Sequence, residues 1–134
     1  MQDLTILLVD DEPLVRECLA EYLQSAGYGL VLAESEDEGY DLALKSSPDL
    51  ILSDFRLGYG SGLSLFSRLK KGLDGRELPG CILMTGYSTM EIAIEANQAG
   101  VEDFLSKPID LGELEAALRG CIERRKLRGS RRQI

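Results

Sequence analysis

The sequence of 134 residues contains no histidine, no tryptophan and only three cysteines. Histidine is the commonest general base near neutral pH, so its absence excludes the Ser-His and Cys-His pairs on which many hydrolases depend. Cys18, Cys81 and Cys121 are widely separated and form no CxxC pair, which argues against a zinc site. We therefore expect three reduced thiols in the core of a cytoplasmic protein.

Long hydrophobic runs are also missing. No stretch approaches the ~18 apolar residues of a membrane-spanning helix, and Met1-Gln2-Asp3 lacks the basic and apolar regions of a secretory signal. We expect no membrane association.

Charge is unevenly distributed along this acidic chain, whose formal net charge is −8. Residues 124–134 carry six cations and no anion, so residues 1–123 hold 9 cations against 23 anions. Such an acidic body repels nucleic acid, and we expect no direct nucleic-acid binding by the domain. The pattern predicts one domain over 1–123 and a basic tail over 124–134, either a helix end or a linker to an absent output domain.

Two hydrophobic periodicities alternate along the chain. Short apolar runs predict strands at 4–9, 30–33, 49–53, 81–84 and 102–105. Helical spacing predicts helices at 13–26, 37–46, from 63, at 88–98 and from 110. The alternation predicts an α/β fold: a doubly wound, five-stranded parallel sheet in a three-layer α/β/α arrangement, with the fifth strand near an edge. The glycine-rich stretch 58–62 is expected to be a flexible loop.

The helices show inward-facing stripes. In the helix at 13–26 the stripe contains seven residues: Leu14, Val15, Cys18, Leu19, Tyr22, Leu23 and Ala26. In the helix at 88–98 it contains Ile92, Ala93 and Ala96.

Polar residues follow four of the predicted strands. Asp10 and Asp11 follow the first strand, Asp54 the third, Thr85 the fourth and Lys107 the fifth. Ligands of open α/β sheets bind outside the carboxyl ends of the strands, so these side chains are predicted to converge.

Their chemistry predicts a phosphoryl site. Three clustered carboxylates repel one another, and a hard cation such as Mg²⁺ offsets that repulsion. The ammonium of Lys107 and the hydroxyl of Thr85 complete a cage for a phosphoryl group. Asp54 is the best nucleophile because it stands alone at the end of a central-looking strand, whereas Asp10 and Asp11 suit metal binding.

The motifs at these strand ends resemble those of response-regulator receiver domains of two-component signalling, with a chemotaxis-Y-like, flavodoxin-like (βα)5 fold. The matching segments are residues 6–13 (ILLVDDEP), 48–54 (PDLILSD), 82–86 (ILMTG) and 103–108 (DFLSKP). The resemblance covers about residues 4–123.

That resemblance implies that a sensor histidine kinase or a phosphotransfer protein phosphorylates Asp54. Mg²⁺ would be bound by Asp11, Asp54 and the backbone carbonyl of Arg56, with Asp10 acting through a water. Lys107 would pair with the phosphoryl group, and the peptide bond between Lys107 and Pro108 is expected to be cis.

The resemblance also implies how the signal leaves the site. Thr85 would move onto the phosphoryl oxygens and Phe104 would rotate inward. The face formed by the fourth helix, the fifth strand and the fifth helix would then be reshaped for an output domain or protein. A homodimer formed on phosphorylation could use Met90, Ile94 and the last helix.

The residues after the acceptor are less typical of the family: Phe55, Arg56 and Leu57 follow Asp54, where many members have a shorter polar or Met-Pro sequence. Arg56 and Tyr87 flank the predicted site, and we expect them to shield the acyl phosphate from water.

Three other functions remain open. A phosphorylation-independent docking module, or pseudo-receiver, would keep the fold without the chemistry. A metal-dependent phosphatase with an Asp nucleophile would share the acidic rim but would need a substrate pocket. A nucleotide-binding protein is disfavoured because residues 58–62 lack the Gly-Lys-Ser/Thr ending of a phosphate-binding loop. We expect a signalling protein rather than an enzyme, one that at most catalyses its own phosphotransfer and autodephosphorylation; the kinase, signal and output partner are not encoded in these motifs.

Overall fold

A computed structural model describes residues 4–74, 76–87 and 89–132, with the backbone alone described over 126–132. The main sheet contains β1 (Thr5–Val9), β2 (Gly29–Ala33), β3 (Leu50–Asp54), β6 (Gly80–Thr85) and β7 (Asp103–Ser106). The helices are α1 (Pro13–Ser25), α2 (Glu36–Ser46), α3 (Gly62–Gly72), α4 (Met90–Gln98) and α5 (Leu111–Arg132). The predicted doubly wound α/β fold is confirmed.

The sheet is entirely parallel and has the order β2-β1-β3-β6-β7, so β3 is central and β7 lies at an edge, as predicted. The chain extends the sheet in one direction to β2 and then in the other direction from β3 onward. The strand order therefore reverses at β1 and β3, and ligands of such sheets bind beside this point.

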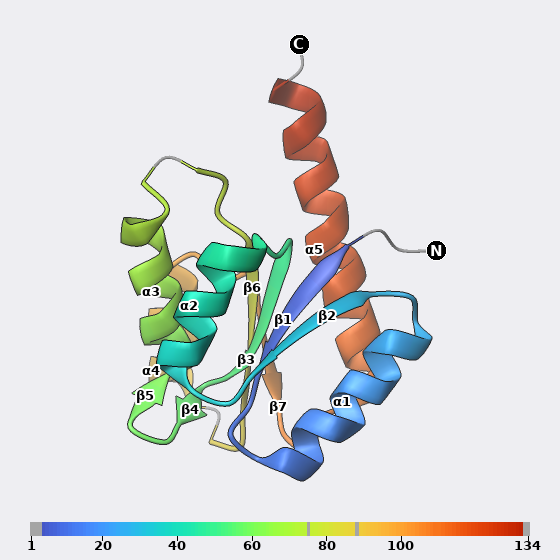
Figure 1. The fold of residues 1–134 in the computed structure, drawn as a ribbon, viewed down its shortest axis with the longest axis vertical. Coiled ribbons are helices and arrows are strands. Elements are labelled where there is room, and N and C mark those ends of the chain that lie inside the picture. Colours follow the sequence, from blue (N-terminus) through green and yellow to red (C-terminus); the bar gives the residue numbers. More distant parts are fainter. Residues whose placement is uncertain (1–3, 75, 88, 133–134) are drawn as a thin grey trace.

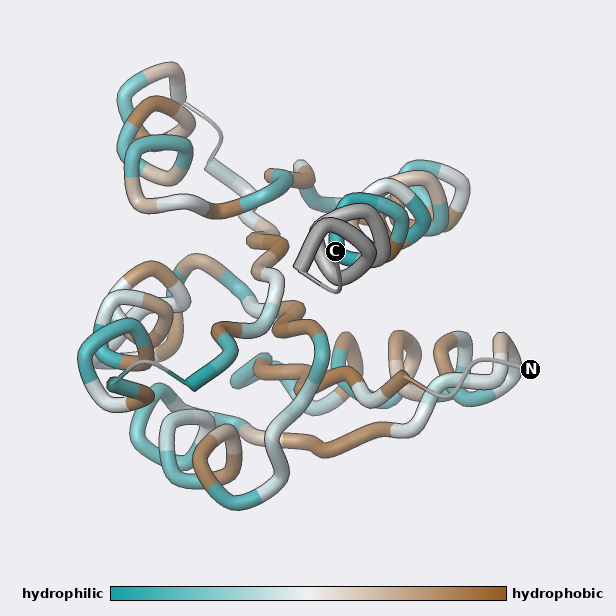
Figure 2. The backbone as a smooth tube through the Cα atoms, turned by 90° about the horizontal axis from the view of Figure 1, so that it is seen from above, coloured by the Kyte–Doolittle hydropathy of each residue, from teal (hydrophilic) through white to brown (hydrophobic). Residues whose placement is uncertain are grey.

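Helices cover both faces of the sheet. In Figure 1, α1 and α5 lie on one side, and α2, α3 and α4 lie on the other. Ile6 and Leu8 belong to the core cluster under α1 and α5, whereas Leu7 and Val9 belong to the cluster under α2 and α3, because successive side chains of a strand point to opposite faces. Figure 2 shows the apolar strands running between the helices.

The stretch after β3 differs from its prediction as a flexible loop. Residues 56–61 form a small antiparallel hairpin of β4 (Arg56–Leu57) and β5 (Gly60–Ser61), in which Arg56 pairs with Ser61. Gly58 has a φ of +61°, a region that residues with a side chain rarely adopt, and so allows the two-residue turn. A strand of two residues has no detectable periodicity, which explains why the loop prediction was wrong.

Some predicted core positions are exposed. Cys18 lies at the surface, whereas Cys81 and Cys121 are buried, so the prediction of three core thiols was wrong for the first. Burial raises the pKa of Cys121 to about 12 and moves the pKa of Cys81 in the same direction, which keeps both thiols protonated. Leu14 is 78% exposed, and Ala93 and Ala26, the C-cap residue of α1, are also exposed.

Helix α5 runs without interruption across residue 123, and its C-terminal turns extend beyond the end of the sheet opposite the β4–β5 hairpin (Figure 1). The domain boundary at this residue stays a prediction, and positions 133–134 of the basic tail lie outside the described residues. So does Ser88, the predicted first residue of α4, which begins at Met90 with Thr89 as its N-cap. No helix among the described residues has the length and apolar character needed to span a bilayer.

Candidate functional site

The predicted polar residues meet at the carboxyl end of the sheet. Asp54 is the last residue of β3, Thr85 is the last residue of β6, and Asp10 and Lys107 directly follow β1 and β7. Asp10, Asp54 and Thr85 are buried, with Asp10 fully inaccessible. Asp11 is exposed at the mouth of the site.

The Lys107 ammonium lies between carboxylates. Its Nζ donates a hydrogen bond to Asp54 Oδ2 at 2.8 Å and approaches Asp10 Oδ2 at 3.4 Å. It also lies 3.6 Å from Glu12 Oε1. Burial alone would lower the pKa of Lys107, but the hydrogen bond to Asp54 and the surrounding negative charge raise that pKa above its usual 10.5. Lys107 therefore stays positively charged and fixes the position of the Asp54 carboxylate.

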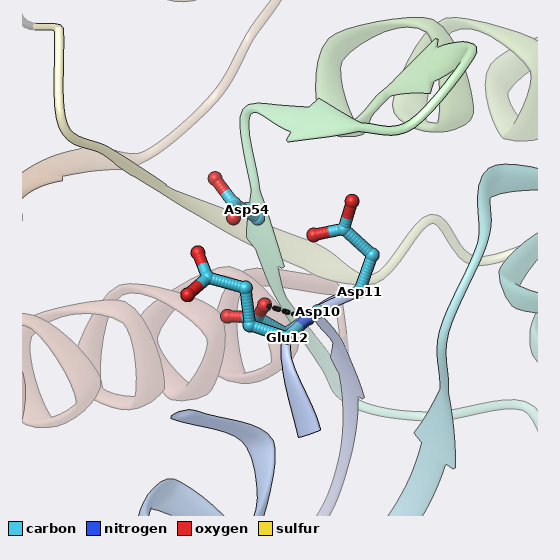
Figure 3. Close-up of side chains that lie close together, drawn as sticks. All are labelled: Asp10, Asp11, Glu12 and Asp54. Atoms are coloured by element: carbon cyan, nitrogen blue, oxygen red, sulfur yellow. Dashed lines mark hydrogen bonds between the residues drawn. The ribbon is translucent and has the colours of Figure 1, made fainter. Parts of the chain in front are cut away.

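One ammonium does not neutralise the acidic cluster. Asp10, Asp11, Glu12 and Asp54 each place a carboxylate oxygen within 4.8 Å of the others. Figure 3 shows these four side chains gathered at the ends of the strands. Burial raises the pKa of the Asp10 carboxyl above its usual 3.8, and the charge of Asp54 adds to that rise, although the Glu12 N–H and Lys107 oppose it. The donors are all carboxylate oxygens, the ligands that hard divalent cations prefer. The residues thus fit a metal ion.

Glu12 was missed as a member of this cluster. Its backbone N–H donates to Asp10 Oδ1 at 2.9 Å, as the dashed line in Figure 3 marks, and its Oε1 lies 3.6 Å from Lys107 Nζ. The sequence did contain a signal for Glu12, because it is the third of three consecutive acidic residues that begin at Asp10. A glutamate before a proline at a helix start, however, is equally typical of an ordinary helix N-terminus.

The predicted switch residues lie on neighbouring strands. Thr85 is 2% exposed, and its Oγ1 accepts a hydrogen bond from the Tyr87 N–H at 3.0 Å. Phe104 is partly buried against the core cluster under α2 and α3. Its strand β7 pairs with β6 so that Ser106 lies opposite Thr85. A displacement of Thr85 would therefore be passed directly to the strand that carries Phe104.

The remaining predicted residues border the site. The N–H of Arg56 approaches Asp54 Oδ1 at 3.4 Å, and the Arg56 guanidinium lies 5.3 Å from the centre of the Tyr87 ring. The peptide bond between Lys107 and Pro108 is cis, as the resemblance implied.

Fold and site together define a small doubly wound α/β domain with a cluster of four carboxylates, suited to a metal ion, at the carboxyl ends of its central strands. A family model for the response regulator receiver domain matches residues 6–119. The chain therefore belongs to the family of response regulator receiver domains.

Curated relatives and solved structures agree with this assignment. The transcriptional regulatory protein GlrR of Escherichia coli is 36% identical over 118 residues, which are 88% of this chain and 26% of that protein. The phosphate regulon transcriptional regulatory protein PhoB of Pseudomonas aeruginosa is 35% identical over 120 residues, covering 90% of this chain and 52% of that protein. The chain thus spans about a quarter to a half of the length of these relatives.

One similar solved structure holds a modified acidic residue. It is a response regulator protein from Burkholderia pseudomallei with a phosphorylated aspartic acid, a calcium ion and citrate. It is 32% identical to this chain, with a TM-score of 0.77, and the match covers 87% of this chain and 66% of that one.

Proposed function

We propose that this domain is a phosphorylatable receiver in which Asp54 accepts a phosphoryl group from a histidine kinase or a phosphotransfer protein. The observation that carries the proposal is the convergence on Asp54, whose carboxylate lies at the end of the central strand, 2.8 Å from the Lys107 ammonium and beside Asp10, Asp11 and Glu12. In a docking module that binds neither a metal ion nor a phosphoryl group, the repulsion among these carboxylates would lower the stability of the fold and serve no function.

The transfer is a displacement at phosphorus. An oxygen of Asp54 forms the new O–P bond while the P–N bond to the donor imidazole breaks, and the imidazole leaves with the bonding electron pair. Asp11, Asp54 and the backbone carbonyl of Arg56 would hold Mg²⁺, with Asp10 contributing through a water, and the bound ion would supply positive charge to the phosphoryl oxygens. Lys107, whose Nζ lies 2.8 Å from Asp54 Oδ2, would supply a second positive charge to the phosphoryl oxygens.

The signal would then reach the surface through Thr85. The phosphoryl group adds about −1.5 to −2 charge and three strong acceptors. The buried Thr85 hydroxyl can donate to one of them, drawing the end of β6 toward Asp54 and leaving room for Phe104. This change favours one of two arrangements of the α4–β7–α5 face.

Partners follow from the same proposal. The relatives are transcriptional regulators, so the reshaped face would contact an output domain or protein, or a second copy of the chain through Met90, Ile94 and α5. Met90 and Ile94 are exposed, at 79% and 51%. The domain itself would act in the cytoplasm as a signalling module whose only reactions are its own phosphotransfer and dephosphorylation.

The direct test is an intact-mass measurement after incubation with Mg²⁺ and a small phosphodonor such as acetyl phosphate. We expect one added phosphoryl group that requires Mg²⁺ and is absent from Asp54→Asn. Asp41→Asn, which removes an exposed carboxylate of α2, should be phosphorylated like the wild type. No adduct on the wild type would contradict the proposal and favour the docking module; turnover of a generic phosphate ester would favour the phosphatase.

A further inference from the structure

We infer that Glu36 is a positioning residue for the proposed metal ligand Arg56. The Glu36 carboxylate, on α2, holds the β4–β5 hairpin, and this hairpin places Arg56 beside Asp54. The inference rests on the proposed function, because the Arg56 carbonyl is there a metal ligand. Nothing in the sequence distinguished Glu36 from the neighbouring acids of the run 34–38.

The carboxylate of Glu36 accepts hydrogen bonds from the hairpin and from α3. Its Oε1 accepts a hydrogen bond from the backbone N–H of Ser61 at 2.9 Å. Its Oε2 accepts from the hydroxyl of Ser64 at 2.9 Å and from Arg68 at 3.0 Å. The side chain is 14% exposed. One carboxylate thus joins the start of α2 to both the hairpin and α3.

The Gly60 backbone closely approaches the side chain of Glu36. A Cβ at Gly60 would lie 2.5 Å from Glu36 Oε1 and 2.8 Å from Glu36 Cβ, so any larger residue here would displace the carboxylate from its present position. The contact between the hairpin and Glu36 therefore depends on both residues: a glycine at position 60 leaves the space that the Glu36 carboxylate occupies.

Ser61 connects Glu36 to the backbone beside Asp54. Ser61 is the pairing partner of Arg56 in the hairpin, and the Arg56 N–H points to Asp54 Oδ1 at 3.4 Å. Ser61 also caps α3, its Oγ accepting from the Ser64 N–H at 2.9 Å. Fixing Ser61 consequently fixes both the start of α3 and the backbone of Arg56.

The donors around Glu36 also fix its charge. Burial acts to raise the pKa of its carboxyl, but the Ser61 N–H, Arg68 and the Ser64 hydroxyl together hold that pKa below 4.5. Arg68 itself is held by Asp37 at 2.8 Å and lies over the Tyr40 ring at 4.3 Å. Glu36 is therefore ionised and anchored at neutral pH, as a fixed support requires.

Asp11 and Glu36 line the same cavity of about 330 Å³, so replacing Glu36 also removes a negative charge near Asp11, a proposed metal ligand. Three variants separate position from charge. Glu36→Ala removes the bonds and the charge. Glu36→Gln removes the charge but keeps an oxygen that can accept from Ser61. Asp37→Ala is the matched control, because Asp37 lines the same cavity and binds Arg68 but is 89% exposed and makes no bond to the hairpin in the described structure.

The experiment is an Mg²⁺ titration of the full chain without phosphodonor, followed by the amide NMR signals of Asp11 and Arg56. We expect Glu36→Ala to bind Mg²⁺ about tenfold more weakly, the lower end of the loss for an outer-shell support. Glu36→Gln and Asp37→Ala should stay within about threefold of the wild type on that same scale. In the metal-free chain, the Arg56 and Ser61 amides of Glu36→Ala should exchange with solvent faster, while amides of β1 keep their wild-type protection.

Three results would overturn the inference: an unchanged affinity in Glu36→Ala, an equal loss in Asp37→Ala, or a Glu36→Gln variant as weak as Glu36→Ala, which would make the effect one of charge. A wild-type chain that binds no Mg²⁺ would overturn it as well. The proposed function is tested separately by the mass adduct on Asp54, so a chain that binds Mg²⁺ through a hairpin supported by Glu36 but gains no phosphoryl group would refute the function alone.

Discussion

The segment after β3 and the segment after β6 both leave the sheet beside Asp54, yet they are held very differently. The first is tied by Phe55, whose N–H donates to the Met84 carbonyl at 2.7 Å, and by the bonds of Glu36. In the second, Tyr87 is 69% exposed, and in α4, whose residues are all described, only Ala96 is buried. Weakly packed segments open at low free energy, whereas well-packed ones do not.

This difference corresponds to two tasks in the proposed mechanism. The segment after β3 supplies a metal ligand, whose position must not change as the phosphoryl group arrives. The segment after β6 must move with Thr85, so few buried contacts have to be broken when it does. A shift of populations requires only a small free-energy difference when the moving part is loosely held.

The largest expected effect compares one glycine from each segment. A Cβ at Gly62 would lie 2.7 Å from the Asp54 carbonyl oxygen and 2.7 Å from Ser53 Oγ, whereas a Cβ at Gly86 would meet no atom within 4 Å. We expect Gly62→Ala to lower the free energy of unfolding by about 2–3 kcal/mol, because buried backbone must shift. Gly86→Ala should change it by less than about 0.5 kcal/mol. Urea unfolding measures both, and equal effects would remove the contrast.

The second prediction concerns transmission into the looser segment. Thr85→Ala should still be phosphorylated on Asp54, but the amide NMR shifts that phosphorylation induces in α4 and at Phe104 should largely disappear. The coupling free energy lost between phosphorylation of Asp54 and the rearrangement of α4 would be of the order of 1–3 kcal/mol, the usual range for two linked sites. Ser106→Ala removes an exposed hydroxyl from the position paired with Thr85 and should leave those shifts unchanged. Full-sized shifts in Thr85→Ala would show that the segment after β6 moves without the Thr85 hydroxyl.

The third prediction concerns the electrostatic cost of burying Asp10, which follows β1 and lies in the acidic cluster beside Asp54. Because burial raises the pKa of Asp10 in the folded chain, its charged form opposes folding at neutral pH, and the penalty fades as the pH falls toward the unfolded value near 3.8. Asp10→Asn should therefore stabilise the metal-free chain at pH 7 by about 1 kcal/mol. That gain should vanish below about pH 3.8.

Thermal unfolding in a chelating buffer at several pH values measures this gain. Asp41→Asn, an exposed carboxylate of α2, should leave the midpoint unchanged at every pH. A lower midpoint for Asp10→Asn at pH 7 would mean that the ion pair with Lys107 outweighs the cost of burying Asp10.

The sequence alone was sufficient for the sheet and for much of the site. The positions of the strands and the chemistry at their ends follow from short apolar runs that end in charged residues, as at Val9-Asp10 and at Ser53-Asp54. Uninterrupted apolar runs of this length are typical of strands buried on both faces, and parallel strands bring their carboxyl ends to one edge of the sheet whatever the loops do.

The supports of the site could not be predicted in this way. Glu36 stands among acids at a helix start, where favourable interaction with the helix dipole explains any carboxylate. Its bond to Ser61 joins residues 25 positions apart through a two-residue strand, so neither periodicity nor local capping rules reveal it. The exposure of Cys18 was missed for a related reason: residues at the margin of an apolar stripe are assigned by tertiary packing, not by spacing.

The smallest expected effect concerns the contact that joins the two segments. The Arg56 guanidinium, from the hairpin, lies 5.3 Å from the ring centre of Tyr87, from the segment after β6. An exposed cation–π contact contributes about 0.5–1 kcal/mol. If this pair covers the acyl phosphate, replacing both residues with alanine should speed dephosphorylation by a factor of about 2 to 5, which is that free energy expressed as a rate.

The decay of the mass adduct on Asp54 after removal of the phosphodonor measures this rate. Tyr59→Ala is the matched control, because Tyr59 is a fully exposed tyrosine at the tip of the same hairpin. Its decay should equal that of the wild type. Each single variant should account for most of the increase, since either change breaks the one contact. An unchanged rate in the double variant would show that water reaches the phosphoryl group from another side, and the two segments would then meet at Asp54 without closing over it.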